Sequence, residues 1–187
     1  MATATIPEQI ETQTNTFLQK FGGFVKECTG LPVNIAGRET SRPAGRYITL
    51  SILDSKEIGY PVANGTDQAG VKTYLVNYIL RVTVTAYRAN AYPPLSAIKH
   101  MILTDSNIYS KYFDGTDAGY LTSNAITRFD VKLDGASFEE RAYCTFDFNV
   151  GYLLEDPITS DVIETIEISR TIETSTSDLN RDITVTK

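Results

Sequence analysis

The chain has 187 residues, a formal net charge of −6, 42% hydrophobic residues and 21% charged residues. This length suits one soluble domain with short extensions and is enough to bury a core without disulfide bonds. Because phosphate binding depends on Lys and Arg, the negative net charge argues against nucleic-acid binding as the main function. It does not exclude a passage through which DNA slides without binding.

The chain begins MATATIPEQIETQTN, which has neither a basic start nor an apolar run, so no signal peptide is expected. No stretch approaches the roughly 18 apolar residues of a membrane span. These features predict a soluble, non-secreted protein made in the cytosol. The two cysteines, Cys28 and Cys144, are expected to be buried free thiols, and a disulfide between them is the alternative.

Two helices are predicted. Over residues 7–28, apolar side chains recur at spacings of three, four and seven, which places them on one helical face. Gly22 and Gly23 interrupt this pattern and are expected to bend or end the helix. The second helix opens at Pro93-Pro94 and ends near residues 104–107. A short aromatic segment at 108–113 is expected to add a turn or two. The apolar stripe of the first helix comprises Ile10, Phe17, Leu18, Phe21, Val25 and Cys28.

Two long strands dominate the rest of the chain. Residues 138–152 and 72–88 both alternate between apolar and polar side chains, which is typical of strands with one buried face. The apolar face of the first contains Ala142, Cys144, Phe146, Phe148, Val150 and Tyr152, and that of the second contains Tyr74, Val76, Tyr78, Leu80, Val82, Val84 and Ala86.

Shorter strands are predicted at 47–55, at 125–133 with Phe129 and Leu133 facing inward, and at 161–170. Asp134-Gly135 supplies a hairpin turn into the central strand. The turn-rich stretch 59–70 is interpreted as a long hairpin loop, and residues 114–119 as a turn. Residues 34–45 are interpreted as a polar, basic loop that either contacts an acidic partner or is simply solvated.

This order of elements predicts an α+β fold: a mostly antiparallel sheet of about four or five strands with two helices packed on its apolar face. Residues 1–170 are expected to form this single domain. Residues 171–187 are too polar to pack alone, so they form either a frayed tail or an arm that orders on a neighbour.

Catalytic patterns are nearly absent. His100 has no nearby Cys or Ser partner motif, and no nucleotide-binding loop or nucleophile motif occurs. Glu139 and Glu140 are adjacent on a strand, so their side chains point to opposite faces and do not converge. We therefore predict no catalytic residue, no cofactor and no metal site, and we do not expect an enzyme.

The aromatic content favours assembly instead. The chain has 11 Tyr and 8 Phe, residue types enriched where protein surfaces meet. Several tyrosines, Tyr47, Tyr87 and Tyr112 among them, are expected in loops or on outward faces. The alternative is that many of these rings are ordinary sheet aromatics.

Four segments, in this order and spacing, resemble the tail-terminator or neck-terminator proteins of tailed bacteriophages over about residues 8–170. They are RPAGRYITLSIL (42–53), YILRVTVTAYRANA (78–91), FEERAYCTFDFNV (138–150) and IETIEI (163–168). In that family an aromatic residue, usually Trp, precedes Glu-Glu-Arg at the start of the central strand. This chain has Phe138 at that position, followed by Glu139, Glu140 and Arg141.

The resemblance implies a non-enzymatic virion protein of the tail or neck. It implies a ring, usually a homohexamer, that stops growth of the tail tube and joins it to the head–neck connector. The implied partners are further copies of the chain, the tube protein, the connector protein and, if the tail contracts, the sheath, while DNA passes through the bore. The alternatives are a head-closure, connector or baseplate protein, or a soluble host binding module or small hydrolase.

Interface candidates come from four segments. By analogy with the family, the start of the central strand lies near a subunit boundary, where charge pairing between neighbours sets register; a solvated strand end is the alternative. The others are the basic loop, the stretch 59–70 and the C-terminal arm. The candidate residues are Arg38, Arg42, Arg46, Tyr60, Asn64, Asp67, Phe138, Glu139, Glu140, Arg141, Thr171, Ile172, Leu179 and Ile183.

Overall fold

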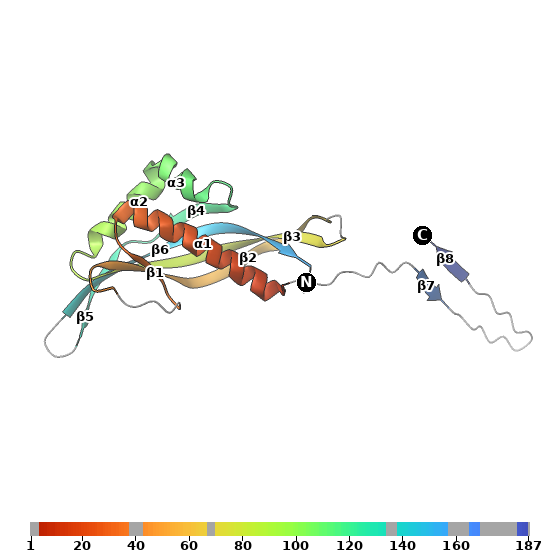
Figure 1. Ribbon diagram of the computed structural model, residues 1–187, viewed down its shortest axis with the longest axis horizontal. Helices are drawn as coiled ribbons and strands as arrows, with labels where there is room; N and C mark the ends of the chain where they lie inside the picture. Colours follow the sequence, from red (N-terminus) through yellow and green to blue (C-terminus); the bar gives the residue numbers. More distant parts are fainter. Residues whose placement is uncertain are drawn as a thin grey trace, which may run out of the picture.

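The long strand expected at 138–152 forms the centre of the sheet in the computed structural model (Figure 1), as β6 (Phe138–Glu155). The structure describes residues 4–37, 43–66, 70–133 and 138–156, together with the backbone of two short strands, β7 (Thr165–Ile168) and β8 (Ile183–Thr186). β7 and β8 pair with each other in antiparallel fashion. The α+β class predicted from the sequence is confirmed.

The main sheet has six strands, against the four or five expected, and its order is β1-β2-β3-β6-β4, with β5 also paired to β6. All pairings are antiparallel except that of β1 with β2. The strands are β1 (Val33–Ile35), β2 (Tyr47–Thr66), β3 (Lys72–Tyr87), β4 (Ala118–Ser123), β5 (Thr127–Lys132) and β6.

Three helices, α1 (Ile6–Thr29), α2 (Tyr92–Thr104) and α3 (Ser106–Phe113), lie on one side of this sheet (Figure 1). Glu8 fixes the start of α1 by accepting hydrogen bonds from the backbone N and the hydroxyl of Thr5, at 2.8 and 2.9 Å. These bonds lower the pKa of Glu8. Among the described residues, no helix is long and apolar enough to cross a membrane.

The core is a cluster of phenylalanine rings between α1, α3 and β6. Phe21 is fully buried, and its ring centroid lies 4.9 Å from that of Phe148 and 5.8 Å from that of Phe146. Phe17 reaches the same Phe148 ring at 5.1 Å. The alternation along β6 therefore predicted the buried face correctly. The buried residues on that face are Ala142, Cys144, Phe146, Phe148, Val150 and Tyr152.

The predicted hairpin loop at 59–70 is wrong, because β2 continues to Thr66. Val62, Ala63, Gly65 and Thr66 pair with the first part of β3, whereas residues 59–61 and Asn64 lie in two register irregularities, at Ile58/Val62 and Ala63/Gly65. Pairing with a strongly alternating partner overrides the local turn preference of these residues.

Two short strands were missed and one strand face was misassigned. β1 overlaps the start of the stretch interpreted as a polar loop (34–45), and β4 begins inside the predicted turn at 114–119. Phe129 and Leu133, expected to face inward, are 36% and 42% exposed. β5 pairs with the start of β6 and its residues are mostly exposed, so its apolar residues remain at the surface.

Gly22 and Gly23 neither bend nor end α1, contrary to expectation; they let neighbouring elements approach the helix. A Cβ on Gly23 would lie 2.5 Å from Cε1 of Tyr112 on α3, whereas one on Gly22 would make an ordinary 3.6 Å contact with Leu50. The Tyr112 ring is held in place, because its hydroxyl donates to Glu27 Oε2 at 2.6 Å.

We expect Gly23→Ala to lower the free energy of unfolding by about 1–2 kcal/mol, since the clash with Tyr112 outweighs the helix propensity of alanine. Gly22→Ala is the matched control and should raise stability by up to about 1 kcal/mol. Urea denaturation of both variants measures the difference. Equal stability of the two would contradict the close packing of α1 against α3.

Both cysteines are free thiols, as expected: Cys144 is buried and Cys28 is half-buried on α1. Burial, aided by the nearby carboxylates of Glu27 and Asp105, raises the pKa of Cys28 to about 11. The thiolate is the reactive form, so its population near pH 8 is about 100-fold below that of a thiol with a pKa of 9. Greater intrinsic nucleophilicity offsets part of this loss.

We therefore expect iodoacetamide to modify Cys28 in the native protein at least about 10-fold more slowly than in the urea-unfolded chain. Labelling time courses followed by mass spectrometry test this. Equal rates in the two states would show that the helix around Cys28 opens freely.

Candidate assembly surfaces

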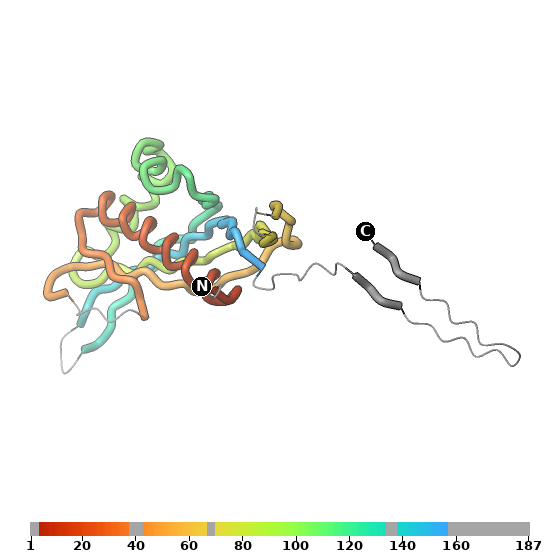
Figure 2. The backbone as a smooth tube through the Cα atoms, turned by 45° about the vertical axis from the view of Figure 1, so that its right-hand side comes forward, coloured from red at the N-terminus to blue at the C-terminus, as the bar shows by residue number. Residues whose placement is uncertain are grey.

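The side of the sheet opposite the helices is open, and its two ends differ in chemistry. One end holds β5 and the start of β6, which we call the hairpin end. The other holds the last part of β2 and the first part of β3, which we call the distal end. Figures 1 and 2 place these two ends at opposite ends of the sheet. The predicted interface residues that the structure describes divide between them.

At the hairpin end, a stack of rings and charges covers the open face. The Tyr47 and Tyr87 rings lie 4.5 Å apart and nearly parallel, with the Arg141 guanidinium 5.0 Å from the Tyr87 ring centroid. Arg141 also donates to the Glu139 carboxylate at 2.8 Å. Tyr47 lies on the sheet face away from the helices, as expected, but it and Glu139 are only 5% and 6% exposed there.

Glu140 points to the other side and organises the turn between β3 and α2. Its carboxylate accepts hydrogen bonds from the backbone N of Asn90 and of Ala91, at 3.1 and 3.2 Å, and its backbone O accepts from Arg88 N at 2.7 Å. Arg88 and Asn90 adopt positive φ of 74° and 58°. Arg46 donates to the O of Asn90 at 2.9 Å.

These contacts bring Arg46, Glu139, Glu140 and Arg141 together at one end of the molecule, although Arg46 lies far from the others in sequence. Glu139 pairs with Arg141 and Glu140 with Arg128, while Arg46 binds a backbone carbonyl; the sequence did not predict these contacts within the chain. An additional role for them between subunits stays a prediction.

The hairpin end also contains a hollow beside this turn. It has a volume of about 330 Å³ and is lined by Arg88, Ala89, Leu133, Phe138, Glu139 and Glu140. Phe138 is 67% exposed at its margin. This margin is therefore apolar, with the cationic Arg88 side chain beside it.

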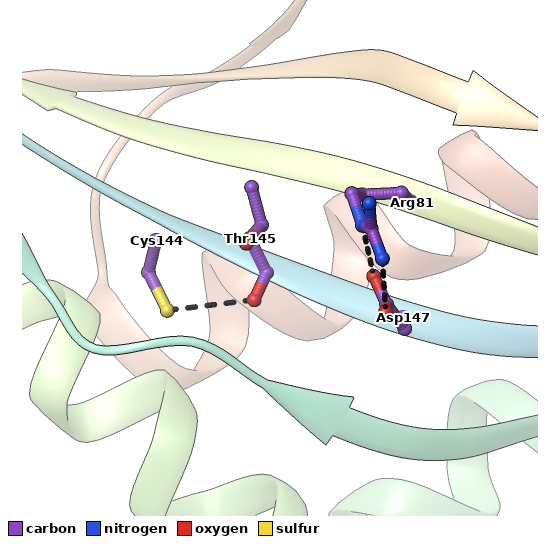
Figure 3. A network of polar contacts seen from close by, with 4 residues as sticks. All are labelled: Arg81, Cys144, Thr145 and Asp147. Carbon is purple, nitrogen blue, oxygen red and sulfur yellow. Dashed lines mark hydrogen bonds and ion pairs between the residues drawn. The ribbon is translucent and has the colours of Figure 1, made fainter.

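The middle of the open face is polar. Arg81 on β3 and Asp147 on β6 form a two-bond ion pair, with N–O distances of 2.8 and 2.9 Å (Figure 3). The hydrogen bond to Asp147 raises the pKa of Arg81. Cys144 lies on the opposite side of β6, where its thiol lies 3.7 Å from the backbone O of Thr145 and 3.2 Å from that of Asn124. The strand alternation thus separates a polar face from the core.

At the distal end, Tyr60 projects from a bulge in β2. It is 91% exposed, the most exposed of the large hydrophobic side chains in the described residues. Gly59 precedes it with φ of 74°, Pro61 follows it, and the register with β3 shifts between Ile58 and Val62. A bulge re-aims a side chain away from the pleat, and proline removes a backbone donor from the strand edge. Asn64 is likewise exposed on β2.

Beside the distal end, α1 covers the last part of the β6 edge. Gln13 binds both the N and the O of Leu153, at 3.1 and 2.7 Å, and Gln9 does the same for Glu155, at 2.8 and 3.0 Å. These two amides, one helical turn apart, occupy the place of an additional strand. They bind backbone N–H and C=O groups at this edge of β6 that would otherwise be available for pairing with a strand of another chain.

For the remaining interface candidates, the structure describes no side chain. Ile183 lies in β8, whose backbone alone is described. Arg38, Arg42, Asp67, Thr171, Ile172 and Leu179 lie outside the described residues.

Within the described parts of the chain, no three His, Cys, Asp or Glu side chains gather as metal ligands. His100 is exposed on α2. The chemistry that these surfaces offer is contact between proteins, through projecting aromatic rings and charged margins.

The comparisons with known proteins agree with this. A family model described as phage neck terminator protein matches residues 9–177. No curated protein matches the chain.

Proposed function

Because this chain belongs to the phage neck terminator protein family, and so is a structural protein of the virion neck or tail, we propose that its copies form a hexameric ring at the end of the tail tube. The ring stops tube polymerisation and offers a surface to the head–neck connector. DNA passes through its bore without specific binding. The sheath is a further neighbour if the tail contracts.

The family match across most of the chain carries this proposal. The structure supports it through the open sheet face, which three helices on the other side leave uncovered and which has exposed aromatic residues at both ends. Surfaces of this kind are typical of proteins that contact several neighbours. The acidic balance of the chain would repel DNA phosphates and so suits a passage rather than a binding site.

We further propose that residues 1–170 form the ring-building domain and that residues 171–187 form an arm that orders on a neighbour. An arm that adds a strand to an adjacent subunit is a recurring mode of assembly.

Assembly of purified tail tube protein tests the function. Adding this chain should arrest tube growth at short lengths and place an extra density at one tube end in negative-stain images. The Gly22→Ala variant, altered only beneath the helices, should act like the wild type, and an unrelated acidic protein should have no effect. Tubes that grow to the same length with or without the chain would refute terminator activity.

A further inference from the structure

Tyr60 at the distal end and the hollow at the hairpin end have complementary shapes. Tyr60 is a projecting ring, 91% exposed, and Pro61 restricts the backbone that follows it. The hollow of about 330 Å³ is open and bordered by Leu133 and Phe138. Tyrosine is among the residue types enriched at binding hot spots, where the side chain fills a well-packed pocket on the partner.

The charges around the two surfaces are also complementary. Among the described residues of the distal end, three carboxylates outnumber two amines, which leaves one net negative charge. The carboxylates are Glu57, Glu155 and Asp156, and the amines are Lys56 and Lys72. Opposite charges at facing surfaces steer association, and like charges disfavour other pairings.

Among the described residues around the hollow, four cations outnumber two anions, which leaves two net positive charges; Glu139 and Arg141 neutralise each other. The cations are Arg46, Arg88, Arg128 and Lys132, and the anions are Asp130 and Glu140. A contact of the Tyr60 end with the hollow is therefore favoured over contacts of either surface with itself. Arg88 at the margin can also approach the face of an inserted tyrosine ring.

Tyr60 cannot reach the hollow of its own chain, because the two lie at opposite ends of the sheet (Figures 1 and 2). Two different surfaces on one chain that fit each other produce a head-to-tail contact, which closes into a ring when the rotation between copies allows it. The right-handed twist along the strands also turns the two ends to different directions.

The geometry points to a second copy of this chain as the partner: Tyr60 of one copy inserts into the hollow bordered by Arg88, Leu133 and Phe138 of the next. This inference rests on the proposed ring and identifies the contact that builds it.

Two surface variants and their mixture test this contact by sedimentation. Wild-type protein should form concentration-dependent oligomers. Tyr60→Asp and Phe138→Asp should each raise the dissociation constant at least about 30-fold, the equivalent of losing a hot-spot residue, and sediment as monomers. An equimolar mixture should form dimers and nothing larger, because one intact Tyr60 surface and one intact hollow remain to meet. Tyr92→Asp, at another half-exposed tyrosine, should oligomerise like the wild type.

Thermal melts of the variants check that each is folded, and changes at these exposed positions should stay within about 0.5 kcal/mol. Three results would overturn the contact: a wild type that is monomeric at all concentrations, a single variant that oligomerises normally, or a mixture that stays monomeric. A chain that oligomerises through Tyr60 but leaves tube growth unaffected would refute the proposed function alone. A chain that arrests tubes while Tyr60→Asp forms normal oligomers would refute this contact alone.

Discussion

Replacing Phe21 with alanine is expected to lower the free energy of unfolding by about 3–5 kcal/mol, the largest effect of any single change considered. The Phe21 side chain is fully buried and contacts five other rings, contributed by α1, α3 and β6, so its loss leaves a cavity that no single element can fill. The contacted rings are Phe17, Phe24, Phe113, Phe146 and Phe148.

Chemical denaturation and thermal melting measure this loss, which should lower the melting temperature by about 6–20 °C for a chain of this size. Leu103→Ala is the control, because this large apolar side chain on α2 is 68% exposed and lies outside the proposed contact, so its removal should change stability by no more than about 0.5 kcal/mol. Phe21→Leu retains part of the volume and should fall between the two. A Phe21→Ala protein as stable as Leu103→Ala would mean that the three elements do not share this core.

Replacing Glu140 with alanine is expected to cost about 2 kcal/mol and to open the turn between β3 and α2. Two backbone N–H groups, of Asn90 and Ala91, lose their acceptor, and the pair of Glu140 with Arg128 at 3.5 Å is lost as well. The positive φ of Arg88 and Asn90 persists only while surrounding contacts hold it. The turn should therefore loosen before the rest of the domain.

Limited trypsin digestion detects this opening, since cleavage after Arg88 should be faster in Glu140→Ala than in the wild type. Glu140→Gln keeps one acceptor oxygen without the charge, so it should lose about 1 kcal/mol and show intermediate cleavage. Asp130→Ala, at an exposed carboxylate on β5, controls for the loss of a charge in the same region. If Glu140→Ala resists trypsin as the wild type does, the turn is held by other contacts.

Tyr60 and Phe138, which form the proposed contact, are both among the interface candidates predicted from the sequence, but they were chosen for reasons other than their geometry. Tyr60 was expected in a hairpin loop, whereas it projects from a bulge within β2. Glu139 and Glu140 are expected at a subunit boundary. In the structure, both side chains make contacts within the chain, Glu139 with Arg141 and Glu140 with the turn between β3 and α2. The sequence indicated that the side chains of turn-rich segments are exposed. It did not predict the strand register, which decides the direction in which each side chain points.

The sequence alone determined the two long strands and their faces, because a strand alternates its side chains at each residue and that pattern is local. It also determined the apolar stripe of α1 and the start of α2. Tertiary structure decided what depends on distant partners. The stretch 56–66 is a strand because β3 pairs with it, Gly23 is needed because Tyr112 packs against it, and the open face has two unlike ends because a long twisted sheet carries them apart. Non-local pairing and close packing outweigh local turn and helix preferences, so these features appear only once the chain is folded.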